Sequence, residues 1–402
     1  MNTRKLLAVV SLGLASLGFA QEKPSELIKA DLLKNVDINL LLRSAFEAPH
    51  TSTDPASATS TQNALRVNEA RLELRGRVVE NLEFRVRTRF HKANPERTLD
   101  KSTNNLDFAY AAYKFGNKKQ WEAVVGKQNN YLGSWEFEKN PTFEYQYSDV
   151  VMGYTNIFGM GARLHYSVNP NHMLTVQAYN TNNDNFTTVT GAAATAPYQY
   201  QNGKELVVRS KMPMGFQLAW QGNFFDKKWR TWYSVGTSEF AKDKRNYQVA
   251  LGNKYIAGKF EGYLDLLYTN LAFDHTSISG LRGAYTKYYN LNNTPVTTPV
   301  FAQDINLKSA VLRMDYQVDP KWTVTTKGFY ETATSNNDDK LGTFRTNLGY
   351  MVGLEFQPVA KQNFKFFTYF YGNNVKYSNI PGVANVNNNV FAIGALYFVN
   401  VL

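Results

Sequence analysis

The sequence predicts an all-β protein: a transmembrane antiparallel β-barrel of 16 strands with long loops at one end. Three observations lead to this fold class. Segments of about ten residues alternate between polar and apolar side chains, which is the period of a strand. The connections between these segments alternate between short turns and long loops rich in Asn, Thr and Gly. The only long apolar run lies at the start of the chain, so the sequence offers no set of membrane-spanning helices.

The apolar run at the start has the features of a secretory signal peptide. Arg4 and Lys5 precede an apolar stretch, and small residues stand just before Gln21. Removal of this segment takes two positive charges from a formal net charge of +11. We expect three parts in order: a signal peptide at residues 1–20, a short N-terminal segment at 21–35 and the barrel at 36–402.

Export also limits the partners of the chain. The mature chain stays basic, as nucleic-acid binders often are, but an exported protein does not meet nucleic acid, so we expect no such partner. The absence of cysteine agrees with passage through an oxidising compartment without disulfides.

Residues 69–90, with the sequence EARLELRGRVVENLEFRVRTRF, predict a charged hairpin. All six arginines have odd numbers, and Leu, Val or Phe residues stand between most of them, so a strand would place the arginines on one face. Because charge is odd-numbered on both sides, the hairpin loop holds an odd number of residues, and three is a common choice. The expected facing pairs are Arg71 with Arg89, Glu73 with Arg87, Arg75 with Arg85, and Arg77 with Glu83. Like charges that face each other repel, so this face is not expected to serve stability alone.

The same alternation runs to the end of the chain. We expect strands at residues 36–46, 65–79, 82–90, 106–115, 120–128, 157–168, 173–180, 204–212, 215–224, 246–254, 258–270, 305–318, 322–332, 343–357, 363–373 and 389–401. In the segment 215–224, for example, Phe216 and Leu218 would face outward and Gln217 and Gln221 inward.

The loop lengths favour a closed barrel in a membrane. Short turns such as 116–119, 169–172 and 319–321 fall on the side of the two termini, and long loops such as 181–203 and 271–304 fall on the opposite side. A barrel in lipid must close, because hydrocarbon cannot satisfy the polar groups of an open sheet edge. The alternative is a repeated soluble β-sandwich, whose inner faces would be apolar and whose turns would not alternate so regularly.

A barrel of this size holds an aqueous channel, so inward charges are wet and can act on solutes. Within each strand, either the odd-numbered or the even-numbered residues point inward, which we call the parity of the strand. This parity predicts that the following basic side chains line the channel and guide anions: Arg71, Arg75, Arg77, Arg85, Arg87, Arg89, Arg163, Arg209, Lys211, Arg313, Lys327 and Arg345. The guanidinium group binds oxyanions through two parallel hydrogen bonds and stays charged at any relevant pH. The alternative is that these arginines pair with Glu73 and Glu83 and stiffen the wall, and both roles can hold at once.

The sequence shows no catalytic or metal-binding pattern, and we expect no catalytic residue, no metal and no cofactor. His165 and Ser167 share one face of a strand, but that face points into the channel, whereas an outer-membrane lipid hydrolase needs a pair that lipid can reach. The five histidines show no metal-ligand spacing. A structural or adhesin barrel, which needs only the long loops, remains an alternative.

Two further segments carry a resemblance to a known family. Together with the arginine hairpin, DFAYAAYKF at 107–115 and VVGKQNNYLGSWEFEKNPTFEYQYSDV at 124–150 resemble the phosphate-selective porin O and P family. The resemblance implies a sixteen-stranded, homotrimeric porin that passes anions. We expect it to lie in the lipid of the bacterial outer membrane and to pass small anionic or neutral solutes. The resemblance also implies that a third loop, matched here by residues 129–156, folds into the lumen as a constriction.

The charges of this third loop set the expected selectivity. They are Glu136, Glu138, Lys139, Glu144 and Asp149, and no arginine is among them. Because these carboxylates would repel a second negative charge, we expect anion preference without a tight phosphate site.

Overall fold

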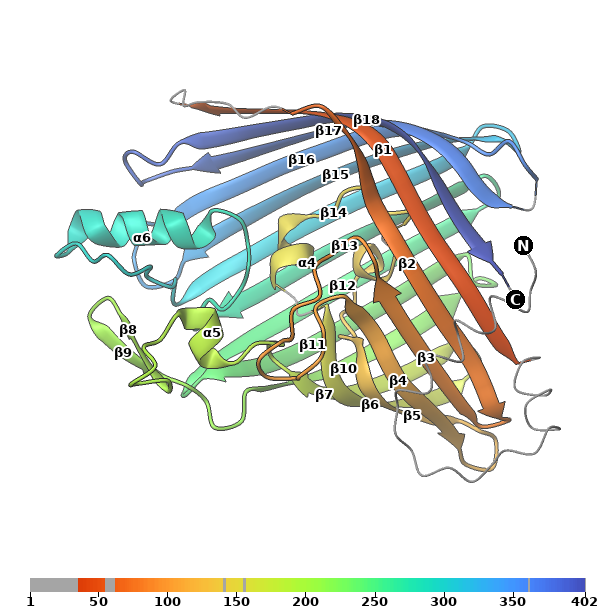
Figure 1. The fold of residues 1–402 in the computed structure, drawn as a ribbon, viewed down its shortest axis with the longest axis horizontal. Coiled ribbons are helices and arrows are strands. Elements are labelled where there is room, and N and C mark those ends of the chain that lie inside the picture. The colour runs from red at the N-terminus through yellow and green to blue at the C-terminus, as the bar shows by residue number, and fades with distance from the viewer. Residues whose placement is uncertain (1–34, 55–61, 140–141, 155–156, 361, 402) are drawn as a thin grey trace.

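The structure is a computed structural model that describes residues 35–54, 62–139, 142–154, 157–360 and 362–401. These residues form a closed barrel of sixteen antiparallel strands in which neighbours along the chain are neighbours in the sheet (Figure 1). The first strand closes the barrel by pairing with the last, from Asn39 opposite Asn400 to Asp54 opposite Asn385. The predicted signal peptide and most of the segment 21–35 lie outside the described residues.

The barrel strands are β1 (Val36–Asp54), β2 (Ala64–Val79), β3 (Leu82–Arg89), β4 (Leu106–Phe115), β5 (Trp121–Asn129), β6 (Phe158–Asn169), β7 (His172–Asn180), β10 (Met214–Phe224), β11 (Trp229–Ala241), β12 (Lys244–Ala257), β13 (Phe260–Leu271), β14 (Ile305–Gln317), β15 (Trp322–Ser335), β16 (Thr343–Phe356), β17 (Asn363–Tyr377) and β18 (Asn385–Asn400). The loops contain a hairpin of β8 (Gln199–Asn202) and β9 (Glu205–Val208) and the helices α3 (Trp135–Glu138), α4 (Asp149–Tyr154), α5 (Phe186–Thr190) and α6 (Leu281–Asn292).

The predicted number of barrel strands is confirmed, but one of the predicted strands is not part of the barrel. Within the expected strand 204–212, Glu205–Val208 pairs only with β8 in a loop hairpin, and the missing barrel strand is β11. The alternation of β11 is obscured because Trp232, an apolar residue, faces inward. Its ring packs on Tyr131 and Trp135 of the third loop, with ring centroids 4.7 and 5.8 Å apart.

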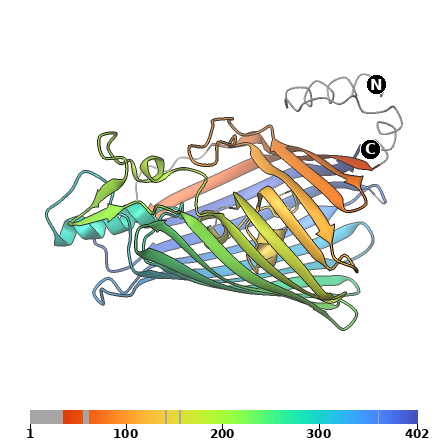
Figure 2. The ribbon, with the colours of Figure 1, turned by 90° about the horizontal axis from the view of Figure 1, so that it is seen from below.

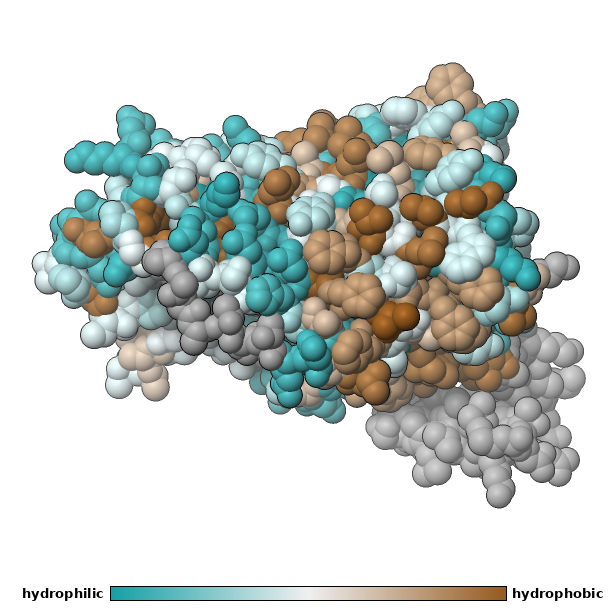
Figure 3. Space-filling model, turned by 90° about the horizontal axis from the view of Figure 1, so that it is seen from above, coloured by the Kyte–Doolittle hydropathy of each residue, from teal (hydrophilic) through white to brown (hydrophobic). Residues whose placement is uncertain are grey.

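The outer surface has the apolar and polar zones expected of a membrane barrel. Phe216 and Leu218 of β10 are exposed on the outside, whereas Gln217 between them is buried on the inside. A predominantly apolar belt covers the strands, and polar residues gather at the loop end (Figure 3). Several strands begin with tryptophan at the short-turn rim, as Trp121 and Trp322 do, and aromatic residues are enriched at membrane interfaces.

The long loops lie at one rim, opposite the termini, as expected, and the connection between β11 and β12 is an exception. It is a tight turn at Lys242 and Asp243, in which Asp243 has a φ of 60°. The loop before β10 and the loop carrying α6 extend beyond the same rim (Figures 1 and 2). They are packed around an aromatic cluster that includes Phe186, Phe240 and Phe301. No helix among the described residues is long and apolar enough to cross a membrane.

Candidate pore constriction

The third loop, between β5 and β6, lies inside the barrel, where α3 and α4 are visible behind the strands (Figures 1 and 2). Asp265 of β13 holds the start of α3. Its carboxylate accepts hydrogen bonds from the Ser134 hydroxyl at 2.8 Å and from the backbone N–H groups of Trp135 and Glu136 at 3.1 and 2.8 Å. A carboxylate at this position satisfies donors that have no partner within the helix.

The second helix of the loop is held in the same manner. The Glu331 carboxylate of β15 accepts hydrogen bonds from the backbone N–H groups of Asp149 and Val150 at 3.2 and 2.9 Å. Asn347 of β16 donates to the same carboxylate at 2.9 Å. The first backbone N–H groups of both short helices therefore donate hydrogen bonds to carboxylates on the wall formed by β13–β16.

The loop's own carboxylates pair with basic residues of that wall. Glu136 pairs with Lys327, Glu144 pairs with Arg313 at 2.9 Å and with Lys327 at 3.1 Å, and Asp149 pairs with Arg345. In the reverse direction, Lys139 pairs with Asp315 at 2.9 Å. The strand cations Arg313, Lys327 and Arg345 thus contact loop carboxylates.

These pairs correct the expectation that an acidic loop repels anions. Glu136 and Glu144 have no exposed surface, and each has a cationic partner. Glu138 is exposed and lines the remaining channel space. Parity alone could not show which loop carboxylates are paired and which are exposed, because that depends on where the loop docks.

The arginine hairpin forms the wall opposite the docked loop. All four predicted facing pairs are confirmed, from Arg71 opposite Arg89 to Arg77 opposite Glu83. The turn itself is shorter than expected: Val79 pairs with Leu82, and a bulge between Arg77 and Val79 supplies the odd offset. The charges of the hairpin therefore share one face, as the spacing required.

A second bulge brings a carboxylate to this wall. Arg87 pairs with Phe108 and Thr88 with Leu106, so Asp107 is the extra residue of β4. Asp107 is fully buried and lies 2.7, 3.0 and 2.9 Å from Arg71, Arg87 and Arg89. Bulges often re-aim a side chain, and here the bulge lets one carboxylate join three guanidinium groups.

The remaining arginines of the hairpin differ in their surroundings. Arg85 donates to Glu73 at 2.7 Å, and its side chain is 26% exposed. Arg85 and Arg87 each lie 4.2 Å from the ring centroid of Phe108, a cation–π distance. Arg75 and Arg77 lie nearer the short turn, more than half exposed, where both approach Glu83.

A cavity of about 470 Å³ separates the arginine hairpin from the third loop. Seven basic residues line it, against three acidic ones. The basic residues are Arg43, Arg71, Arg85, Arg87, Arg89, Lys92 and Lys139, and the acidic residues are Glu69, Glu138 and Glu144. Aromatic side chains, among them Phe108, Phe158, Tyr145 and Tyr147, also line it. This positively charged passage can attract small anions through Coulomb interactions and hydrogen bonds.

The other predicted basic residues are scattered. Arg163 of β6 is buried on the lumen side, 4.9 Å from the ring of Tyr131. Arg209 and Lys211 belong to no barrel strand, because the expected strand 204–212 is absent; both are exposed at the loop rim. Their predicted place inside the channel is therefore wrong.

The prediction missed two buried charged residues, of which Glu331 holds the third loop. Glu331 shares the parity of Lys327 on β15, so the alternation could have revealed it. Lys127 pairs with Asp100 at 2.6 Å and is buried, but parity gave no signal for it. Gly126, with a φ of 131°, precedes it, and Val125 is exposed on the outside, so the alternation is interrupted there.

The described residues hold no group of three or more potential metal ligands. His165 is buried and lies 2.6 Å from the Thr175 hydroxyl.

The closed barrel, the apolar outer belt and the charged passage define a channel of the bacterial outer membrane.

Sequence comparison identifies the family. The pattern that defines the phosphate-selective porin O and P family matches residues 49–398, so the chain belongs to this family. It is an outer-membrane porin that allows passive diffusion, a channel rather than an enzyme. A comparison with curated protein sequences gave no match.

Solved structures share the fold at low sequence identity. The outer membrane channel DcaP of Acinetobacter baumannii is 14% identical, with a TM-score of 0.58 over 95% of this chain and 100% of that chain. An anion-selective porin from Comamonas acidovorans is 12% identical, with a TM-score of 0.55 over 90% of this chain and 99% of that chain. A loop-deletion mutant of OmpT from Vibrio cholerae is 11% identical, with a TM-score of 0.53 over 90% and 99% of the two chains.

Proposed function

We propose that this porin prefers anions because solutes pass between the arginine hairpin and the docked third loop. The observation that carries the proposal is the excess of basic residues around the cavity, seven against three. The loop carboxylates that could oppose this field are neutralised by the other wall, apart from Glu138. Asp107 and Glu73, which pair with the hairpin arginines, raise the acidic count to five, so a passing anion still meets an excess of positive charge.

The same geometry argues against a tight phosphate site. Arg71, Arg87 and Arg89 share Asp107, and Arg85 donates to Glu73. A phosphate must compete with these carboxylates for the guanidinium groups. A micromolar site requires about 8 kcal/mol of binding free energy, and conduction favours weaker binding. Small anions and neutral solutes should pass, and phosphate should block chloride current only at millimolar concentration.

A planar-bilayer recording in a salt gradient tests the proposal, because the reversal potential reports charge preference. The double variant Arg43→Gln/Arg85→Gln should shift the reversal potential toward cations. The matched control, Arg75→Gln/Arg77→Gln, removes the same charge from the short-turn end of the wall and should shift it less. Equal shifts would show that the cavity does not control selectivity, and half-block by micromolar phosphate would refute the weak-site proposal.

The proposed assembly is a homotrimer. Closed symmetry is usual for homo-oligomers, and OmpT of Vibrio cholerae, 10% identical with a TM-score of 0.50, has been solved in a trimer form. A mass measurement in mild detergent should give three copies of the chain, and a mass of one copy alone would contradict the proposal.

A further inference from the structure

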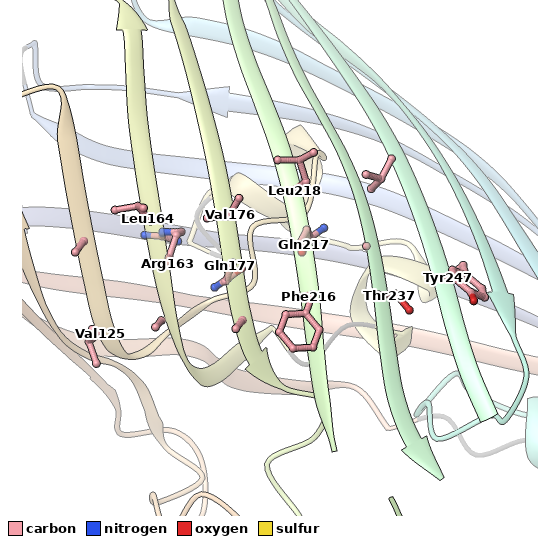
Figure 4. Close-up of a pocket in the computed structure, with 15 residues that line it drawn as sticks. Val125, Arg163, Leu164, Val176, Gln177, Phe216, Gln217, Leu218, Thr237 and Tyr247 are labelled. Carbon is pink, nitrogen blue, oxygen red and sulfur yellow. The ribbon is translucent and has the colours of Figure 1, made fainter. Parts of the chain in front are cut away.

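A hollow lies on the outside of the barrel wall, away from the pore. It is an open depression with a volume of about 880 Å³. Its lining comes from β5, β6, β7, β10, β11 and β12, and Figure 4 shows Leu164, Val176 and Leu218 on the neighbouring strands β6, β7 and β10. We name this feature the wall hollow.

The registers of the strands explain why the wall is hollowed there. Ala162 pairs with Ala178, and Ala178 pairs with Phe216, so two small side chains stand next to each other in one outward row. The next row carries Leu164, Val176 and Leu218, which are larger. Two adjacent alanines between larger apolar side chains leave a depression in a surface that faces hydrocarbon.

The wall hollow continues into a second, basic pocket at the loop rim. Phe216 and Thr237 line both pockets. Lys211, Lys242 and Arg245 supply the basic groups of the second pocket, and we name these three residues the rim cluster. Lys242 and Arg245 have side chains that are 62% and 55% exposed.

Two carboxylates lie in the same pocket and reduce its charge without cancelling it. Glu239 approaches Arg245 at 3.3 Å and accepts a hydrogen bond from Ser210 at 2.7 Å. Asp243 lies 3.9 Å from Lys242 and is 85% exposed. The exposed ammonium and guanidinium groups can reach a ligand at the membrane surface, because long basic side chains extend toward the interface.

We propose that the wall hollow and the rim cluster together bind one phosphorylated lipid of the outer leaflet. An acyl chain would lie in the hollow, and a phosphate group would contact the rim cluster. The long-loop rim faces the outside in barrels of this kind, so the rim cluster lies at the level of outer-leaflet head groups. A second copy of this chain fits less well, because an apolar barrel wall offers no anion to the rim cluster.

Native mass spectrometry of the purified full protein tests this site, with diphosphorylated lipid A as the probe and phosphatidylethanolamine as the zwitterionic comparison. The variant Lys211→Gln/Lys242→Gln/Arg245→Gln should bind lipid A about tenfold more weakly or worse, because each basic residue near an anionic lipid adds to binding. The matched control is Lys227→Gln/Lys228→Gln/Arg230→Gln, which removes the same charges at the opposite rim of the same strands. It should bind lipid A like the unaltered protein.

A second pair of variants tests the hollow. Ala178→Trp fills it and should also weaken lipid A binding, whereas Ala111→Trp places the same side chain on the outer face of β4, outside the hollow, and should not. Unaltered single-channel conductance confirms that each variant is folded.

Three results would overturn the proposal. The first is equal loss of lipid A in the rim-cluster variant and its control. The second is unchanged binding in Ala178→Trp, which would leave the hollow without a role. The third is a shift of Ala178→Trp to a lower oligomeric mass with lipid A binding unchanged, which would assign the hollow to a second copy of the chain.

Discussion

The two walls of the lumen carry similar inward charges but use them differently. On β14–β16, Arg313, Lys327 and Arg345 contact carboxylates of the third loop and fix the loop in place. On the arginine hairpin, the guanidinium groups pair with carboxylates of the wall itself and line the cavity. The comparison shows that an inward basic residue becomes a structural or a solute-facing group according to whether the loop covers it.

The largest expected effect comes from breaking the loop-bearing wall. Lys327→Met would leave Glu136 and Glu144 buried with one cationic partner fewer. Loss of one member of a buried ion network costs about 3–5 kcal/mol. We expect a lower thermal midpoint and a noisier, larger conductance as the loop undocks.

Lys365→Met is the matched control for that prediction. Lys365 pairs with Glu355 at 2.6 Å, but its side chain is 20% exposed and it pairs with no loop carboxylate. A thermal midpoint and conductance that change equally in both variants would contradict the special role of the docked wall.

The second prediction sharpens the role of the arginine hairpin. Asp107→Asn removes the charge that three arginines share, so these groups become available to solutes. We expect stronger anion preference and a phosphate half-block concentration lower by about tenfold, since charge-assisted bonds to a phosphate are strong. Chloride current titrated with phosphate measures this, and a weaker block would show that Asp107 is required to hold the arginines in place.

A smaller effect is expected from Glu138, the exposed carboxylate of the third loop. Glu138→Gln removes one negative charge from the cavity and should raise anion preference slightly, because exposed charges in wide, wet channels are screened over about 8 Å at physiological salt. Glu96→Gln changes an exposed carboxylate outside the cavity lining and serves as its control. Reversal potentials that do not differ between the two would remove Glu138 from the selective passage.

The smallest effect is a pH dependence at the end of the arginine hairpin. Burial lowers the pKa of His91 below its ordinary value of 6.5, although Glu69, 3.4 Å away, opposes the shift. His91 is therefore neutral at pH 7.5 and gains a positive charge only as the pH falls below 6.5. Anion preference should rise slightly as the pH is lowered stepwise below 6.5, and His91→Gln should abolish that rise while leaving the preference at pH 7.5 unchanged.

Much of the barrel follows from the sequence alone. A period of two is a local property, because successive side chains of any strand point to opposite faces. This is why the arginine hairpin could be paired residue by residue, and why Phe216 and Gln217 were placed on the correct faces. The same logic could have placed Glu331 beside Lys327 on the inner face of β15.

Other features were decided by tertiary structure. Strand β11 was missed because Trp232 is apolar yet inward, and only the docked loop gives it an apolar environment. Bulges brought Asp107 to the arginines and set the turn of the hairpin, and an inserted residue leaves little trace in a short alternating segment. Alternation determines which face a charge occupies. Its partner comes from segments far away in the chain, such as Glu144 for Arg313, so only the folded structure decides which charges remain available to solutes.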